Sequence, residues 1–196
     1  MPTFSAKLNR VAHNLKVVEA SDYAAHVEAA IALLTDLFTR QRKLLVFGNG
    51  GSAADAQHIC GELVGRFLLN RAPLSAIALT SDSSVLTSWS NDFEFDTVFS
   101  RQVEAHGRAG DVAWGISTSG NSKNVVHALQ AAKAKHMPTI GMTGEGGGAM
   151  APHCDVLLAV PLRATPDIQE IHLISYHYIC EQVESALFNE SAGPTG

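Results

Sequence analysis

The sequence predicts an α/β protein in which a parallel sheet is covered by helices on both faces. The chain contains five short apolar runs bounded by Gly, Pro, Asp or Ser, which are typical of buried strands. Helix-like segments separate these runs, and the alternation predicts right-handed βαβ units. The 196 residues, 46% of them hydrophobic, suffice for one sizeable core and a single domain.

Two helices are expected before the first strand. The first carries apolar residues at alternating spacings of four and three, the narrow seam typical of coiled-coil packing. The seam residues are Phe4, Leu8, Val11, Leu15 and Val18. The second helix is expected over residues 22–40. The narrow seam favours packing between subunits, and packing on its own domain explains it nearly as well.

The remaining elements follow in order from residue 43. The expected strands cover 43–48, 75–80, 111–117, 138–144 and 155–160. Helix patterns cover 52–68 and 124–136, and the last helix follows Pro166. The tail over 189–196 is expected to fray. The domain thus divides into N-terminal helices over 1–41 and a core over 42–190.

Charge and cysteine usage narrow the class of protein. The net charge of -5, with scattered Lys and Arg, argues against nucleic-acid binding. The three cysteines show no CxxC spacing, so a disulfide scaffold is not expected and a reducing cytoplasm fits better. The chain has no run of 18 apolar residues, so we expect no membrane segment.

A glycine-rich loop, "GNGGS" over 48–52, follows the first strand. Its glycines permit a tight backbone, Ser52 is placed to N-cap the next helix, and the free N–H groups of that helix could hold an anion. The spacing is neither GxGxxG nor a Walker motif, so a nucleotide site is not supported. An ordinary strand-to-helix turn also explains this loop.

A second polar loop, "STSGNS" over 117–122, follows the third strand. Ser117, Thr118, Ser119 and Ser122 offer four hydroxyls around one glycine at another helix start. Such a cluster suits a phosphate monoester, whereas an N-cap and a turn account for one or two of the hydroxyls. Because the carboxyl ends of parallel strands are where ligands bind, two such loops favour a phosphate site.

His58 and Glu62 stand four residues apart on the helix after the glycine loop, so they share one helix face. A histidine and a carboxylate at this spacing suit a zinc site or an acid–base pair. Isolated pairs of this kind are usually just a polar helix face. Their position one turn beyond a candidate phosphate loop makes the functional interpretation stronger here.

Taken together in order and spacing, the motifs resemble those of the sedoheptulose 7-phosphate isomerases, or phosphoheptose isomerases, of the sugar isomerase (SIS) superfamily. They are "GNGGSAADAQH", "ND" at 91–92, "FSRQVEAHGRAGDV", "GISTSGNS" and "IQEIH". The resemblance implies one SIS domain over 1–196, with a five-stranded parallel, flavodoxin-like sheet in an αβα sandwich. It also implies a homotetramer with the N-terminal helices in its interfaces, active sites between subunits and one Zn²⁺ per subunit.

The resemblance also implies roles for individual residues. The metal ligands would be His58, Glu62, Gln169 and His177, with Glu62 and His177 also acting as base and acid. The substrate would contact Asn49, Gly50, Gly51, Ser52, Asn91, Asp92, Ser117, Thr118, Ser119, Ser122 and Gln169. An Asx-turn explains Asp92 about equally well.

The position of Gln169 poses a geometric difficulty. Gln169 and His177 are eight residues apart, which is about 12 Å of helical rise, so they reach one ion only if their side chains lean together or if Gln169 lies where the helix begins. His172 is the local alternative partner of Gln169. We favour His177, because an adaptor family related to the isomerases shares the "IQE..H" unit but lacks that histidine.

The implied activity is the conversion of sedoheptulose 7-phosphate to D-glycero-D-manno-heptose 7-phosphate, the first step of activated heptose biosynthesis for lipopolysaccharide or capsule. The partners are then a sugar phosphate and other copies of the chain, with neither nucleic acid nor membrane. Two alternatives stay open. One is the related non-enzymatic adaptor of the bacterial replication initiator, disfavoured by Glu62 and His177. The other is a sugar-phosphate-sensing SIS domain.

Overall fold

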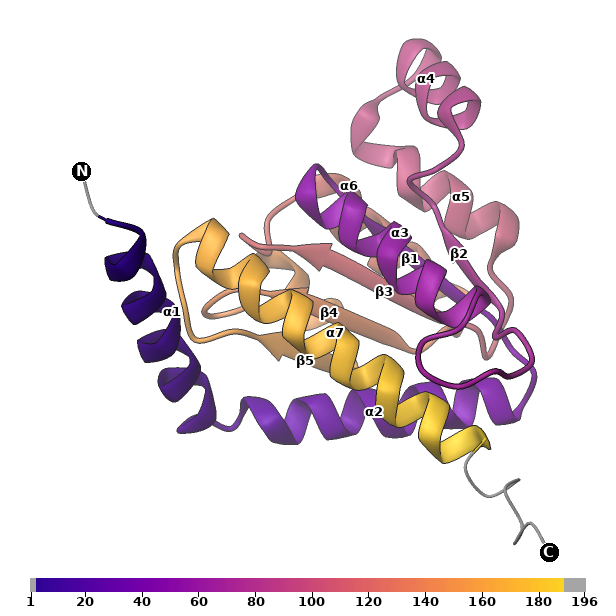
Figure 1. Cartoon of the computed structure of the whole chain (residues 1–196). Coiled ribbons are helices and arrows are strands. Elements are labelled where there is room, and N and C mark those ends of the chain that lie inside the picture. The colour runs from indigo at the N-terminus through magenta and orange to yellow at the C-terminus, as the bar shows by residue number, and fades with distance from the viewer. Residues whose placement is uncertain (1–2, 189–196) are drawn as a thin grey trace, which may run out of the picture.

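The computed structural model of the chain, which describes residues 3–188, confirms the expected αβα sandwich (Figure 1). All strand pairs are parallel and the order is β2-β1-β3-β4-β5, the flavodoxin-like arrangement. The strands are β1 (Leu44–Gly48), β2 (Ala76–Ala78), β3 (Val112–Ser117), β4 (Thr139–Thr143) and β5 (Val156–Ala159). Each lies within the apolar run that predicted it. The tail over 189–196 falls outside the described residues.

Helices cover both faces of this sheet (Figure 1). One core cluster joins α2, α3 and α7 to the sheet, and a second cluster joins α5 and α6 to the opposite face. The helices are α1 (Phe4–Glu19), α2 (Tyr23–Thr39), α3 (Gly51–Val64), α4 (Ser83–Asp92), α5 (Val98–His106), α6 (Lys123–Ala134) and α7 (Thr165–Phe188), with 3₁₀ turns η1 (Phe95–Thr97) and η2 (Gly148–His153). Within residues 3–188, none of the helices has the length and apolar character that crossing a bilayer requires.

Strand β1 shows why its sequence is continuously apolar. Leu44 and Val46 point into the first core cluster, while Leu45 and Phe47 point into the second. Successive side chains of a strand face opposite sides of a sheet, so a strand covered on both faces must be apolar at every position. The polar residues of this region therefore begin only where the strand ends, at the glycine loop.

Helix α1 leaves its apolar seam uncovered within the single chain. Phe4 is 77% exposed, Leu8 53% and Leu15 42%. Ion pairs attach the helix to the start of α7, where Lys7 and Arg10 each lie 3.1 Å from the buried carboxylate of Asp167. The carboxylate of Asp167 is thus paired with cations of α1, and this pairing holds α1 against α7.

One capping expectation is wrong. We expected Ser52 to N-cap the helix after the glycine loop, but α3 begins at Gly51 and Gly50 occupies the N-cap position. Gly50 has a φ of +56°, a left-handed conformation that glycine adopts without steric cost and that turns the chain into the helix early. Ser52 is consequently a buried residue of the first helical turn.

Candidate active site

The two polar loops meet at the carboxyl ends of β1 and β3. The side-chain amides of Asn49 and Asn124 exchange two hydrogen bonds, of 2.8 and 2.9 Å, between the glycine loop and the first turn of α6. Asn124 is buried, so this pair is a fixed internal link and not a surface contact. The pair holds the starts of α3 and α6 next to each other.

The hydroxyls of the second loop form a cluster of their own. Ser117 donates a hydrogen bond of 3.0 Å to Ser122, and its oxygen lies 3.5 Å from that of Ser119. Ser122 is the N-cap residue of α6, yet its side chain makes no capping hydrogen bond. The N–H groups of Val125 and Val126 donate to the carbonyl oxygen of Ser122, so the N–H groups of residues 123 and 124 are the ones at this helix start that could face an anion.

A second cluster lies farther along the helices, where α3 and α7 run side by side. Nε2 of His58 lies 2.9 Å from a carboxylate oxygen of Glu62 and 3.4 Å from Nε2 of His177. One ligand atom from each of the three residues can be chosen so that all lie within 4.8 Å of one another. His58 is partly exposed, so the cluster opens to solvent at the surface of the chain.

The donor set of this cluster fits a divalent metal. Zinc binds imidazole nitrogen and carboxylate oxygen at about 2.0–2.2 Å, which puts neighbouring ligands of a tetrahedral site about 3.3 Å apart. The separations of 2.9 and 3.4 Å around His58 are close to that spacing. The imidazoles of His58 and His177 approach with ring centroids 5.0 Å apart and nearly perpendicular planes, and their Nε2 atoms are the nitrogens that lie close together.

Gln169 lies at the other end of α3, against the glycine loop. A Cβ added to Gly51 would meet Nε2 of Gln169 at 2.3 Å, so a larger residue there would displace the end of this side chain. Gln169 also lies in the second turn of α7, near the start of that helix. A position near the helix start was one of the two geometries that would allow Gln169 and His177 to reach one ion. The structure thus puts Gln169 beside the phosphate loop, and His177 beside His58 and Glu62.

His172 is not part of either cluster. It is fully buried, and its Nε2 lies 3.1 Å from the carbonyl oxygen of Thr143 at the end of β4. Burial lowers the pKa of His172 to about 4, so this imidazole is neutral and anchors α7 to the sheet. This placement favours His177 over His172 as the histidine of the candidate metal site.

Asn91 and Asp92 lie apart from both clusters, at the end of α4. This helix has no buried residues and projects away from the sheet (Figure 1). The amide of Asn91 donates a hydrogen bond of 2.8 Å to Asp92, and both residues are exposed. Within the single chain, the pair therefore faces solvent.

Two residues that lie behind His58, Tyr176 and Asp55, were not predicted from the sequence as part of the site. The hydroxyl of Tyr176 lies 2.9 Å from Nδ1 of His58 and 3.5 Å from Oδ1 of Asp55. Burial, together with the nearby Asp55, raises the pKa of Tyr176 far above its ordinary value, so the residue remains a neutral hydroxyl. In the sequence, Asp55 is one helical turn before His58, and Tyr176 immediately precedes His177. These positions next to candidate ligands are the only sequence features that could have indicated the two residues.

A buried ion pair, also missed, supports the end of α3 that carries Glu62. The Glu184 carboxylate accepts hydrogen bonds from the backbone N–H groups of residues 67–69 and from Nε of Arg71. The Arg71 guanidinium donates to the carbonyl oxygens of Glu62 and Leu63, at 2.8 and 2.7 Å, and thereby caps the helix. Burial favours the neutral acid, but these hydrogen bonds outweigh it and hold the pKa of Glu184 below its usual value.

The fold and the two clusters define a protein of the sugar isomerase class. Residues 6–144 match the family model of the SIS domain. The chain is 56% identical over 170 residues to the phosphoheptose isomerase of Synechocystis sp., covering 87% of this chain and 88% of that protein. It is 52% identical to the phosphoheptose isomerase of Crocosphaera subtropica, covering 91% and 92% of the two chains.

A solved structure agrees with these relatives. Phosphoheptose isomerase GmhA from Neisseria gonorrhoeae superposes with a TM-score of 0.86 at 43% identity, over 92% of this chain and 96% of that one. The chain belongs to the phosphoheptose isomerase family of SIS domain proteins. It is therefore an isomerase, and the adaptor and sensor alternatives are set aside.

Proposed function

We propose that the enzyme converts sedoheptulose 7-phosphate to D-glycero-D-manno-heptose 7-phosphate, the first step of activated heptose biosynthesis. The observation that carries this proposal is the cluster of His58, Glu62 and His177, which lies between α3 and α7, farther along α3 than the glycine-rich loop, in a chain of this family. An extended sugar phosphate needs both an anion site and a separate acid–base site, and the two clusters supply them.

The loops hold the phosphate at one end of the substrate. In this proposal Ser52, Ser117, Ser119 and Ser122, with the N–H groups at the starts of α3 and α6, surround the phosphate oxygens. Asn49, Gly50, Gly51, Thr118 and Gln169 complete that end. Fixing the remote phosphate positions the reacting carbons, which removes part of the entropic barrier.

Glu62 and His177 perform the proton transfers at the other end. Glu62 takes a proton from C1 of the ketose. The electron pair of that C–H bond forms a C1–C2 double bond, and the π pair of the C2 carbonyl moves onto O2, which gives an enediolate. The hydroxyl proton then passes from O1 to O2 as a proton is returned to C2, which His177 delivers. The aldose results with no net change in atoms or electrons.

We further propose one Zn²⁺ per subunit, bound by His58, Glu62 and His177. Gln169, whose side chain lies against Gly51 in this structure, would have to turn along α3 to add its amide oxygen as a further ligand. The ion would supply Lewis-acid polarisation of the substrate carbonyl. Support comes from the spacing of the three donor groups and from the mixed nitrogen and oxygen set they form. A carboxylate has two oxygens, so Glu62 can bind through one and accept a proton on the other.

An isomerase assay with metal control tests this function. Purified protein should convert sedoheptulose 7-phosphate to the aldose, and excess chelator should abolish the activity without changing the far-UV circular dichroism. Added Zn²⁺ should restore activity, because the core does not depend on the ion. Wild-type turnover in a metal-free preparation would contradict the metal centre, and absence of isomerisation in the Zn²⁺-loaded protein would contradict the proposed reaction.

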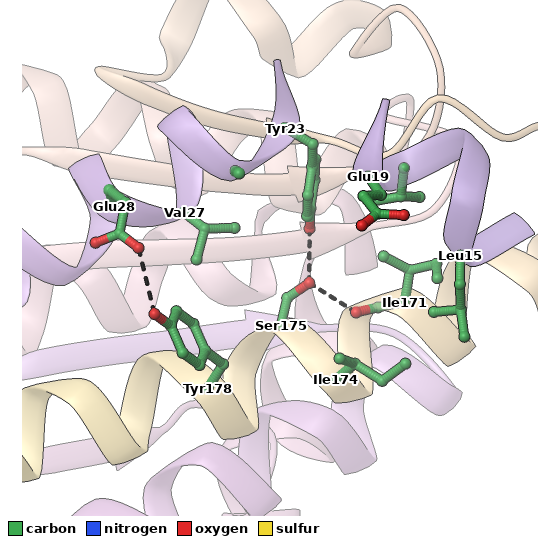
Figure 2. A pocket seen from close by; sticks show the side chains of 11 residues that line it. Leu15, Glu19, Tyr23, Val27, Glu28, Ile171, Ile174, Ser175 and Tyr178 are labelled. Carbon is green, nitrogen blue, oxygen red and sulfur yellow. Dashed lines mark hydrogen bonds between the residues drawn. The ribbon is translucent and has the colours of Figure 1, made fainter. Parts of the chain in front are cut away.

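We propose that the chain acts as a homotetramer, assembled through α1 and the groove beside it. The exposed seam of α1 continues into an apolar groove of about 320 Å³ between α1, α2 and α7 (Figure 2). Leu15, Ile174 and Tyr178 line it, and the hydroxyl of Tyr23 lies 3.0 Å from Ser175 at its base. A neighbouring copy would cover this surface and could bring its α4, with Asn91 and Asp92, to the site.

Leu8→Glu should therefore reduce the assembly to smaller species, because it puts a charge into the apolar seam. Light scattering at micromolar concentration should give a tetramer for the wild type and a lower mass for the variant. His13→Glu is the matched control, since residue 13 lies on the opposite face of α1 by the helical period. A wild-type monomer, or equal effects of the two variants, would refute the seam as an interface.

The remaining proposals concern the whole chain. We propose that residues 1–196 form one SIS domain and that the enzyme works in the cytoplasm. All three cysteines are free thiols, as expected of a protein from a reducing compartment.

A further inference from the structure

We propose that Tyr176, backed by Asp55, is a positioning residue that holds His58 with Nε2 directed at the metal and thereby raises the affinity of the site for Zn²⁺. This inference rests on the metal centre proposed above. It assigns a role to Tyr176 and Asp55, which make no contact with the substrate in that proposal. Both residues act on the metal only through the ligand His58.

The geometry brings Tyr176 to one particular nitrogen of the imidazole. The tyrosine is 1% exposed, and its hydroxyl lies 2.9 Å from Nδ1 of His58. The two rings meet edge to face with centroids 5.3 Å apart, which fixes the plane of the imidazole. Since Nδ1 is engaged by Tyr176, Nε2 is the nitrogen left to face Glu62 and His177.

The hydrogen-bonding capacity of each group then determines the tautomer. A metal needs the lone pair of Nε2, so the proton of a neutral His58 must be on Nδ1 and be donated to the oxygen of Tyr176. The hydroxyl of Tyr176 then requires an acceptor for its own proton. Oδ1 of Asp55 lies 3.5 Å from that hydroxyl and can accept the proton. The result is a chain of hydrogen bonds from His58 to Tyr176 to Asp55.

Asp55 is suited to this function by its surroundings. Its second oxygen, Oδ2, is buried and has no hydrogen-bond partner among the described residues, so the carboxyl group is not explained by a structural ion pair. Asp55 and His58 lie three residues apart on α3, whereas Tyr176 and His177 are adjacent on α7. Helix α3 therefore supplies two ligands and one supporting residue, and helix α7 supplies one of each.

The test compares metal affinity in three variants. Tyr176→Phe keeps the ring but leaves Nδ1–H of His58 without an acceptor, and Asp55→Ala removes the end of the chain. Removing a supporting partner of a metal ligand typically lowers affinity by about 10–100-fold, and we expect that loss for Zn²⁺ in a competition titration with a chromophoric chelator. The double variant should lose about as much as the worse single variant, because the two residues act through one chain.

The matched control is Tyr178→Phe, the same substitution two residues farther along α7. Among residues 3–188, that hydroxyl makes only a long, exposed contact of 3.4 Å with Glu28, so Zn²⁺ affinity should not change. Because Tyr178 also lines the groove of the proposed interface, light scattering checks that this variant keeps the wild-type mass. A second readout is independent of affinity. Long-range ¹H–¹⁵N NMR spectra of the Zn²⁺-loaded wild type should show His58 protonated at Nδ1, and Tyr176→Phe should weaken or mix this tautomer while circular dichroism stays unchanged.

The outcomes separate this inference from the proposals beneath it. Wild-type affinity in Tyr176→Phe, additive losses in the double variant, or an Nε2-protonated His58 in the loaded wild type would each overturn it. A wild type that takes up no Zn²⁺ would overturn both the inference and the metal centre. Failure of the sugar isomerisation alone would leave the affinity and NMR readouts intact, so it would count only against the reaction.

Discussion

Glu62→Gln should lower the turnover of sedoheptulose 7-phosphate by about 10³-fold, within the range that general acid–base groups supply. The amide has nearly the same shape and can still hydrogen bond to His58, but it cannot accept the proton from C1. The folded structure should survive, because Glu62 lies on the open face of α3 and not in the core. The measurement is kcat with Zn²⁺ in excess, alongside the melting temperature.

The control for this variant is Glu104→Gln, which removes a more exposed carboxylate from α5, on the other face of the sheet. Its kcat should match that of the wild type. Wild-type kcat in Glu62→Gln at both limiting and excess Zn²⁺ would remove Glu62 from the mechanism. A kcat that is low at limiting Zn²⁺ but equal to that of the wild type in excess Zn²⁺ would show that Glu62 acts only as a ligand.

Glu184→Gln should have the largest effect on stability, lowering the free energy of unfolding by about 3–5 kcal/mol, the usual cost of removing one partner of a buried ion pair. The side chains of Arg71 and Glu184 are each only 2% exposed. The substitution leaves the guanidinium charge buried without a counter-ion, and the amide cannot replace all four hydrogen bonds that the carboxylate accepts. Denaturant titration at fixed protein concentration measures the change.

The control is Glu181→Gln on the exposed face of α7, which should stay within about 0.5 kcal/mol of the wild type. A second variant, Glu184→Gln with Arg71→Met, should recover part of the loss if the unpaired charge is its main cause. Equal stability of Glu184→Gln and Glu181→Gln would contradict the structural role of this ion pair.

The fold could be predicted from the sequence because its signals are local. Each strand of a sheet covered on both faces is a continuous apolar run, as in Leu44–Gly48, and polar or glycine residues mark where it ends. The pair of His58 and Glu62 is local in the same sense, since the helical period alone puts them on one face. His177 was reached only through the resemblance, because 115 residues separate it from Glu62.

The supporting residues could not be predicted, because their roles depend on how distant segments pack. Tyr176 meets His58 across 118 positions of sequence, and Glu184 meets residue 67 across 117. Neither residue type has a spacing pattern that indicates such a contact. The capping expectation for Ser52 failed for a different reason, since a positive φ at Gly50 starts the helix sooner than composition suggests.

The proposed anion site lies at the start of α3 and the proposed acid–base site lies farther along it, which has a consequence for the size of substrate the enzyme would accept. An α-helix is stiff along its axis, and the six residues from Ser52 to His58 fix about 9 Å of rise between the anion end and the histidine. A molecule anchored at the loops must span that interval to reach the acid–base groups. In the proposed binding mode, helix α3 therefore sets the minimum chain length of a reactive sugar phosphate, and we expect a shorter one to bind without reacting.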